Sequence, residues 1–184
     1  MRFFSRVLPF LFIALMTLGL VMPGAKAASG AEVDVRVDDA LKAFRQQVKG
    51  ADAVLKDAKG VLVMPRVFKA GIGLGGEYGE GGLRIGGKTV DYYNIVAASY
   101  GFQLGAQKKS IILVFLDDKA LQNFRDSEGW TAGVDASVAL IKIGKAGELD
   151  IAQLNKPVVA FVFGQKGLMY NLSLEGSKFT RIKK

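Results

Sequence analysis

The sequence predicts an α+β fold in which short N-terminal helices and one central helix pack on a curved, mostly antiparallel, glycine-rich β-sheet or partial barrel. Three observations predict it. Apolar residues recur at helical spacing early in the chain. Short apolar or alternating runs, typical of strands, follow as far as the C-terminus. Between Gly71 and Gly87 nine of seventeen positions are glycine, which excludes a helix there because each interior glycine costs about 1 kcal/mol relative to alanine.

Residues 1–27 are predicted to be a secretory signal peptide. Arg2 and Arg6 form a positive start, an apolar run follows, and Ala25-Lys26-Ala27 supplies the small-x-small cleavage pattern. The alternative is a membrane anchor, but the apolar run is shorter than the roughly 20 residues that a spanning helix needs. The mature chain then begins near Ala28, and we expect it to be periplasmic or secreted.

Composition narrows the function classes. The chain of 184 residues has neither cysteine nor histidine, which excludes disulfides, thiolate or imidazole metal sites, a Ser-His-Asp triad and the acylated cysteine of a lipoprotein. Carboxylate, lysine, tyrosine or serine chemistry remains open for catalysis, and hard oxygen sites of the calcium or magnesium kind remain open for metals. We expect no enzyme, no metal and no cofactor. Removal of the signal peptide lowers the net charge from +8 to +5, a surplus that suits an anionic partner and also suits a plain soluble protein.

The first elements are read from helical spacing. Residues 28–37 are small and polar and are expected to form a flexible tether before a domain over residues 38–184. Asp38 or Asp39 is predicted to cap a first helix, which ends at Gly50. A second short helix is expected from Ala51 to Ala58, with Gly60 beyond its end.

Strands dominate the remainder. Residues 61–64 begin them, and the glycine-rich stretch is predicted to form strands that other backbone crosses closely. Residues 100–105 and 111–116 are expected to pair as a hairpin around a basic turn at residues 107–110. Asp117 or Asp118 is predicted to cap the central helix. Further strands are expected over residues 136–143, 158–163, 168–174 and 178–182.

Two nucleotide-binding patterns occur in the glycine-rich stretch. Residues 71–76 fit G-x-G-x-x-G, and residues 82–89 fit G-x-x-x-x-G-K-[ST]. A phosphate loop must lead into a helix N-terminus, whereas Thr89 is followed by a β-branched and aromatic run. We therefore expect no nucleotide, and export also makes nucleic acid an unsuitable partner. Five carboxylates are candidates for acid–base chemistry or calcium binding, although caps and solvated turns explain them more simply: Glu77, Glu80, Asp91, Asp117 and Asp118.

A basic stripe beside an apolar one is the main candidate binding feature. Such a pair of stripes is typical of a helix lying on anionic headgroups, and equally of a helix packed on its own domain with a solvated charged back. The predicted lipid-binding residues are Lys42, Arg45, Lys49, Lys56, Lys59, Arg66 and Lys69, and the predicted membrane-facing apolar residues are Leu41, Phe44 and Val48.

Residues 61–81, VLVMPRVFKAGIGLGGEYGEG, resemble the SYLF domain, a lipid-binding family related to yeast actin-binding and Las-binding proteins. Ser99-Tyr100-Gly101, Gly129-Trp130 and Gly133-Val-Asp135 continue the likeness, which covers residues 38–183. The resemblance implies phospholipid binding, often of phosphoinositides in eukaryotic members, to which an N-terminal amphipathic segment contributes. It also implies actin binding in yeast relatives, from which a signal peptide would separate this chain.

These observations predict an exported, non-enzymatic phospholipid-binding module that associates peripherally with anionic membrane surfaces through a basic N-terminal face. The alternative is an envelope structural or protein-interaction domain without a specific lipid ligand. A carboxylate-based hydrolase is a third reading, which would depend on residues such as Glu77, Glu80 or Asp117.

Overall fold

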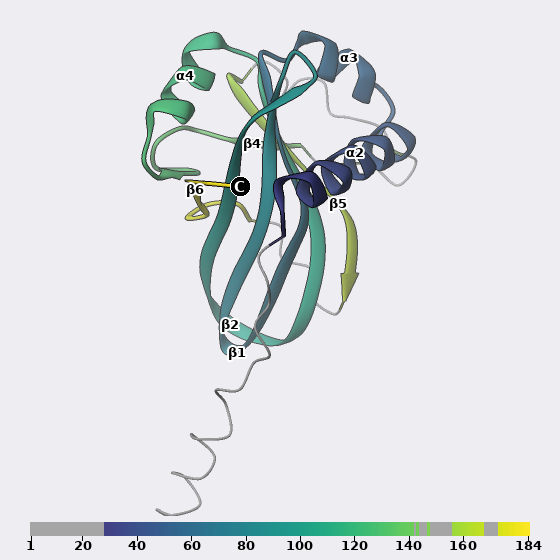
Figure 1. Ribbon diagram of the computed structural model, residues 1–184. Coiled ribbons are helices and arrows are strands. Elements are labelled where there is room, and N and C mark those ends of the chain that lie inside the picture. The colour runs from purple at the N-terminus through teal and green to yellow at the C-terminus, as the bar shows by residue number, and fades with distance from the viewer. Residues whose placement is uncertain (1–27, 142, 144–146, 148–155, 168–172) are drawn as a thin grey trace, which may run out of the picture.

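The computed structural model describes residues 28–141, 143, 147, 156–167 and 173–184. They form the predicted α+β fold, with helices packed on one strongly curled sheet (Figure 1). The described helices are α2 (Gly30–Gln47), α3 (Ala51–Asp57) and α4 (Asp118–Asp126). The described strands are β1 (Gly60–Ile85), β2 (Lys88–Phe115), β3 (Trp130–Thr131), β4 (Ala139–Ile141), β5 (Val158–Gly167) and β6 (Lys178–Ile182).

One long antiparallel hairpin, β1–β2, organises the sheet. Its register runs from Gly60 opposite Phe115 to Ile85 opposite Lys88. The two halves of β2 have different second neighbours, since β5 pairs with the half near Phe115 and β6 with the half near Tyr92. Among the pairings between described strands, β4–β5 is the parallel one. The sheet is therefore mixed and mostly antiparallel, as predicted.

The hairpin turn lies at Gly86 and Gly87, which have φ angles of 57° and 80°. Glycine adopts these positive angles without steric cost, and two-residue hairpin loops require them. The predicted basic turn at residues 107–110 is wrong, because these residues continue β2. Residues 82–89 form the end of β1, this turn and the start of β2, so that Thr89 leads into a strand and not into the helix that a phosphate loop requires.

The hairpin is folded over at its middle, where the β1–β2 register shifts between Ile72 and Leu74. The second half of β1 consequently crosses the first half at close range. A Cβ atom at Gly79 would lie 2.7 Å from the carbonyl oxygen of Arg66, and one at Gly81 would lie 2.8 Å from the carbonyl carbon of Val63. The prediction that backbone closely crosses the glycine-rich strands is thereby confirmed.

Helix α2 begins at Gly30, so the predicted tether over residues 28–37 is wrong. Ser29 and Glu32 form a capping box in which the Ser29 hydroxyl accepts from the Glu32 amide and the Glu32 carboxylate accepts from the Ser29 amide. These hydrogen bonds to Ser29, that from its backbone amide first, lower the pKa of Glu32 from its ordinary value. Val33 and Val37 then continue the buried stripe of the helix toward Phe44.

Helices α3 and α4 begin and end close to the predicted positions. Gly50, with a positive φ of 86°, precedes α3. The side chain of Asp117 accepts a hydrogen bond from the Ala120 amide at 2.8 Å and caps α4, as predicted. Of the later predicted strands, residues 136–143 shorten to Ala139–Ile141, and most of the strand predicted over residues 168–174 lies outside the described residues.

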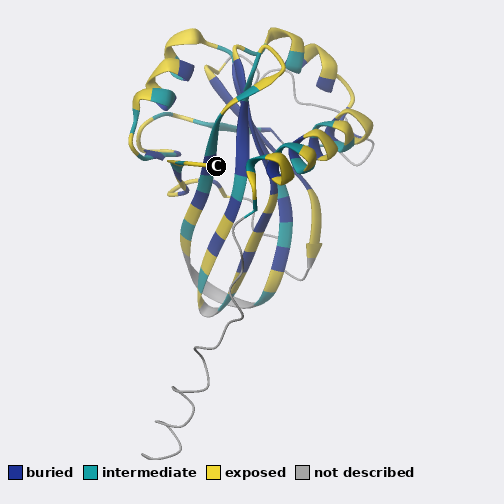
Figure 2. Ribbon diagram, viewed as in Figure 1, coloured by how far each residue is buried: buried dark blue, intermediate teal, exposed yellow. Residues whose placement is uncertain are grey.

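Apolar side chains fill both faces of the sheet near its helix-covered end (Figure 2). On the outer face α2 packs on the strands, with the Phe44 ring 5.0 Å from that of Phe161 and 5.5 Å from that of Phe163. On the inner face the Phe124 ring of α4 lies 5.3 Å from Trp130. Both clusters lie within residues 28–184, which therefore contain the hydrophobic core of the domain.

Within the described residues, no helix has both the length and the apolar character needed to cross a membrane. The predicted signal peptide, residues 1–27, lies outside them.

Candidate functional site

The predicted basic residues on α2 and the segment after it lie on the solvent side. Lys42, Arg45 and Lys49 are exposed. The Arg45 guanidinium pairs with Asp52 of α3 at 3.0 Å, which offsets part of its charge. These residues therefore form the charged outer back of a helix whose apolar side packs on the sheet.

The predicted membrane-facing apolar residues do not face outward. Phe44 is completely buried and Val48 is buried beside it, while Leu41 is half-buried against the same cluster. Their helical spacing places these side chains on the side of the helix that packs against the sheet. Burial of each large side chain there contributes about 1.5–3 kcal/mol. The membrane-facing assignment is thus wrong for Phe44 and Val48, and the core-packed alternative holds. Lys69 is also buried, on the inner face of β1.

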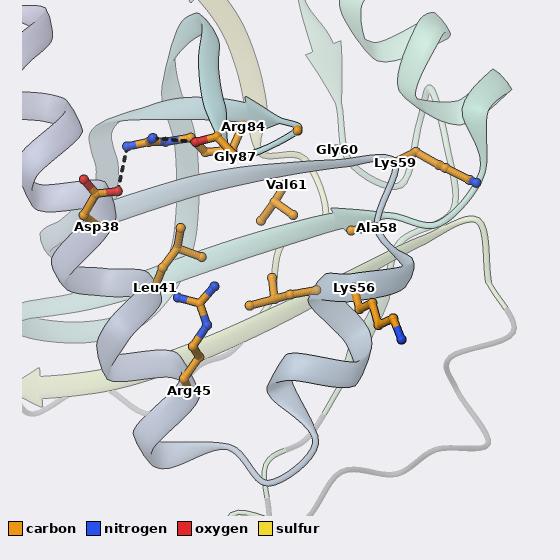
Figure 3. Close-up of a pocket in the computed structure, with 12 residues that line it drawn as sticks. Asp38, Leu41, Arg45, Lys56, Ala58, Lys59, Gly60, Val61, Arg84 and Gly87 are labelled. Carbon is orange, nitrogen blue, oxygen red and sulfur yellow. Dashed lines mark hydrogen bonds and ion pairs between the residues drawn. The ribbon is translucent and has the colours of Figure 1, made fainter.

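A pocket of about 440 Å³ between α2, α3 and the hairpin turn is lined by three of the predicted lipid-binding cations, Arg45, Lys56 and Lys59 (Figure 3). Its cations do not converge, since Lys56 and Lys59 extend away from Arg45 and Arg84 (Figure 3). Arg84 donates to the Asp38 carboxylate at 2.8 Å and to the Gly87 carbonyl at 3.0 Å. Lys59 lies 3.9 Å from the carboxylate of Asp118. Most of the cations in this pocket therefore already have protein partners and are not available to bind an anion.

A second cleft, of about 200 Å³, lies where α2 meets β1, β2 and β5. Its lining carries four cations from four elements: Arg36, Arg66, Lys108 and Lys166. Of these only Arg66 was among the predicted residues. Within the described part of the chain none of the four forms an ion pair, and Asp39 is the single carboxylate in the lining. We call this site the basic cleft.

Sheet register positions the cations of the basic cleft. Lys108 of β2 is directly opposite Lys166 of β5 and, on its other side, opposite Phe68 of β1. Directly opposed residues of antiparallel strands point to the same face. A register shift between Met64 and Val67 changes which residues of β1 face outward, so that Arg66 is exposed beside this row.

An apolar surface adjoins the basic cleft. A neighbouring pocket of about 390 Å³ is lined by Arg36 and Arg66 together with Phe68, Tyr78 and Glu80. The Glu80 carboxylate is already occupied, since it accepts from the Tyr78 hydroxyl at 2.9 Å and pairs with Lys184 at 2.7 Å. Burial, and secondarily the hydrogen bond to Glu80, raises the pKa of Tyr78 above its ordinary value. Tyr78 is therefore neutral at physiological pH.

This arrangement suits the binding of phosphate or carboxylate groups. Guanidinium groups bind such oxyanions through paired N–H donors, and lysine adds a point charge. The surplus of four cations over one carboxylate leaves a local positive field that an anion would neutralise.

The predicted carboxylate candidates have structural partners instead. Glu77 pairs with Lys109 at 2.9 Å, and Asp91 pairs with Arg125 at 3.3 Å. Asp117 caps α4, and Asp118 lies near Lys59. No group of three or more His, Cys, Asp or Glu side chains that could hold a metal ion occurs in the part of the chain that the structure describes.

The fold and this surface together define an α+β domain with an unneutralised basic cleft beside exposed apolar side chains. The model of the Ysc84 family, described as Las17-binding protein actin regulator, matches residues 96–184. This match confirms, over residues 96–184, the resemblance to the SYLF family that the sequence indicates. None of the curated proteins gives a significant match.

The matched segment is part of a larger structural unit. It begins at Val96, inside β2, while β1 pairs along almost the whole of β2 and α2 packs on the resulting sheet. Residues 28–95 therefore complete the same fold and supply Arg36 and Arg66 to the basic cleft.

Proposed function

We propose that this protein is an exported, non-enzymatic module that binds anionic phospholipid at a membrane surface and associates with it peripherally. The observation that carries the proposal is the basic cleft, whose four cations have no ion-pair partner among the described residues. The adjacent apolar side chains of Phe68 and Tyr78 are exposed. Unneutralised cations beside exposed apolar groups are the two components of interfacial membrane binding.

Electrostatic attraction supplies the first part of the binding energy. Each lysine or arginine near an anionic bilayer contributes about 1 kcal/mol. Arg36 extends this field onto α2, so that the N-terminal helix takes part through this residue. Lys42 and Lys56 would act only at longer range, because they lie outside the cleft and salt screens charges beyond about 10 Å.

A protein partner is the second candidate. The description of the matched family names binding to Las17 and regulation of actin, and an exported chain would use the same surface for a partner in the cell envelope. An acidic protein segment would also find the unpaired cations of the cleft. Vesicle binding by the purified protein, with no other protein present, separates the two candidates.

Removal of the cleft charges is expected to weaken vesicle binding on the order of a hundredfold, since three contributions of about 1 kcal/mol are lost. The variant is Arg66→Gln/Lys108→Gln/Lys166→Gln in residues 28–184, and the probe is a vesicle of equal parts phosphatidylglycerol and phosphatidylcholine in a flotation assay. These side chains lie at the surface, so the fold should persist.

The matched control is Lys42→Gln/Lys56→Gln/Lys59→Gln. It removes the same net charge from the basic stripe that the sequence alone predicts to bind lipid. Its binding should fall much less than that of the cleft variant. Equal losses in the two variants would indicate a response to net charge only and would reject the cleft as the site.

A further inference from the structure

Around the bend of the β1–β2 hairpin, apolar side chains lie on the outer face of the sheet and polar side chains on the inner face, the opposite of the arrangement usual in water-soluble proteins. Near the helices both faces of the sheet carry buried apolar residues, whereas toward the bend buried and exposed residues alternate along each strand (Figure 2). On the outer face, Phe68 is 56% exposed, Leu74 67% and Val96 50%. Val96 lies directly opposite Tyr78, which is also exposed. Ala70 and Ala106, which lie directly opposite each other, are exposed as well.

The inner face of the same segment is polar. Lys109 is 1% exposed and Glu77 is buried beside it, with their charged groups 2.9 Å apart but not aligned as a hydrogen bond. Lys69 and its directly opposed neighbour Gln107 are buried on this face as well. Burial of charges is expensive unless they are paired, so a sheet adapted to water on its outside would place these groups outward.

Carboxylates are missing from the outer face around the bend. Residues 96–110 contain no aspartate or glutamate, and in residues 66–79 the single acidic residue is Glu77, which points inward. The first charged groups beside the apolar surface are the cations of the basic cleft, with Lys108 directly opposite Phe68. The carboxylate that borders Tyr78, Glu80, is already paired with Lys184, so cations are in surplus around the apolar surface. Such a surface is complementary to an acyl layer beneath anionic headgroups.

We infer that the hairpin bend inserts its outer apolar face into the acyl region of the membrane while the basic cleft binds the headgroups above it. The inference deepens the proposed function and rests on it. Phe68, Leu74, Tyr78 and Val96 would lie at the boundary between headgroups and acyl chains, the depth of about 5–10 Å that interfacial elements reach. A second copy of this chain is a poorer occupant, because it would oppose like cations, and the bordering carboxylate of Glu80 is already paired with Lys184.

The absence of cysteine allows a unique probe of insertion. Leu74→Cys in residues 28–184 is labelled with an environment-sensitive fluorophore and mixed with vesicles of equal parts phosphatidylglycerol and phosphatidylcholine, with or without brominated acyl chains. Val134→Cys is the matched control, since Val134 is 78% exposed and lies after β3, outside the hairpin. Flotation of each labelled variant is measured in the same samples.

Insertion predicts that brominated chains quench the label at position 74 several-fold more than the label at position 134. It also predicts that Leu74→Asp weakens flotation on the order of tenfold, whereas Val134→Asp does not. Flotation with equal, weak quenching at both positions would overturn insertion and leave headgroup binding intact. Failure of the unlabelled protein to float would overturn the proposed function, and insertion with it.

Discussion

Gly81→Ala is expected to lower the free energy of unfolding by about 3 kcal/mol or more, measured by chemical denaturation. The added methyl group would collide with the backbone of Val63 on the crossing half of β1 and would lie 2.6 Å from the Met64 sulfur. The backbone contact cannot be relieved by a change of rotamer, so the two halves of the folded hairpin must separate. Overpacking of a close-packed interior typically costs 1–3 kcal/mol, and more where backbone must move.

Gly76→Ala is the matched control for this prediction. Gly76 lies on the same strand, but no atom lies within 4 Å of the position that its Cβ would occupy. The substitution should therefore leave the free energy of unfolding within about 0.5 kcal/mol. Comparable losses at both positions would contradict the close crossing of the two halves of β1.

Lys109→Met is expected to destabilise the protein by about 3–5 kcal/mol, because it leaves the buried carboxylate of Glu77 without its partner charge. The ion pair is almost fully inaccessible to solvent, so water cannot replace the lost interaction. Methionine keeps the length and apolar stem of lysine, which limits the change to the charge. The measurement is the same denaturation experiment.

The double variant Glu77→Met/Lys109→Met separates the loss of the pair from the loss of packing. Replacement of a buried pair by apolar side chains is often neutral or stabilising, so the double variant should recover most of the stability that the single variant loses. A single variant with a cost below about 1 kcal/mol would contradict the buried position of this pair.

Much of the fold is predictable because the apolar runs, helix caps and glycine positions in the sequence agree with the way the elements pack. The apolar run 111–116 forms the C-terminal end of β2, where both hydrophobic clusters pack on it, and Asp117 caps α4 where the pattern predicts a helix start. The glycine-rich stretch was predicted to be crossed closely because so many positions without side chains favour close backbone contact. Gly79 and Gly81 provide that contact.

Two local predictions failed for identifiable reasons. Helix α2 begins earlier than predicted, because the Ser29-x-x-Glu32 capping box starts it at Gly30 and Val33 and Val37 belong to its buried stripe. The segment 107–110 looks like a turn because two lysines follow each other. In the structure Lys108 faces outward in the basic cleft and Lys109 faces inward toward Glu77. A strand with one lysine on each face and a polar loop have the same local sequence. They differ only in the residues that each lysine contacts in the folded protein.

The candidate site was less accessible to sequence reasoning than the fold. The predicted basic stripe followed consecutive helices, where spacing is readable, and most of its cations proved dispersed or ion-paired. The basic cleft instead collects Arg36, Arg66, Lys108 and Lys166 from four elements. Sheet register and the bulge before Val67 bring them together, and neither is visible in a single sequence.

The most direct test of anionic phospholipid binding is flotation of residues 28–184 with vesicles of graded phosphatidylglycerol content across a salt series. Binding should rise steeply with phosphatidylglycerol and fall with salt, because the cations of the basic cleft interact with headgroups through a screened field. Protein that remains with the buffer at every composition and salt concentration would contradict lipid binding. Such a result would leave a protein partner in the cell envelope as the better account of the cleft.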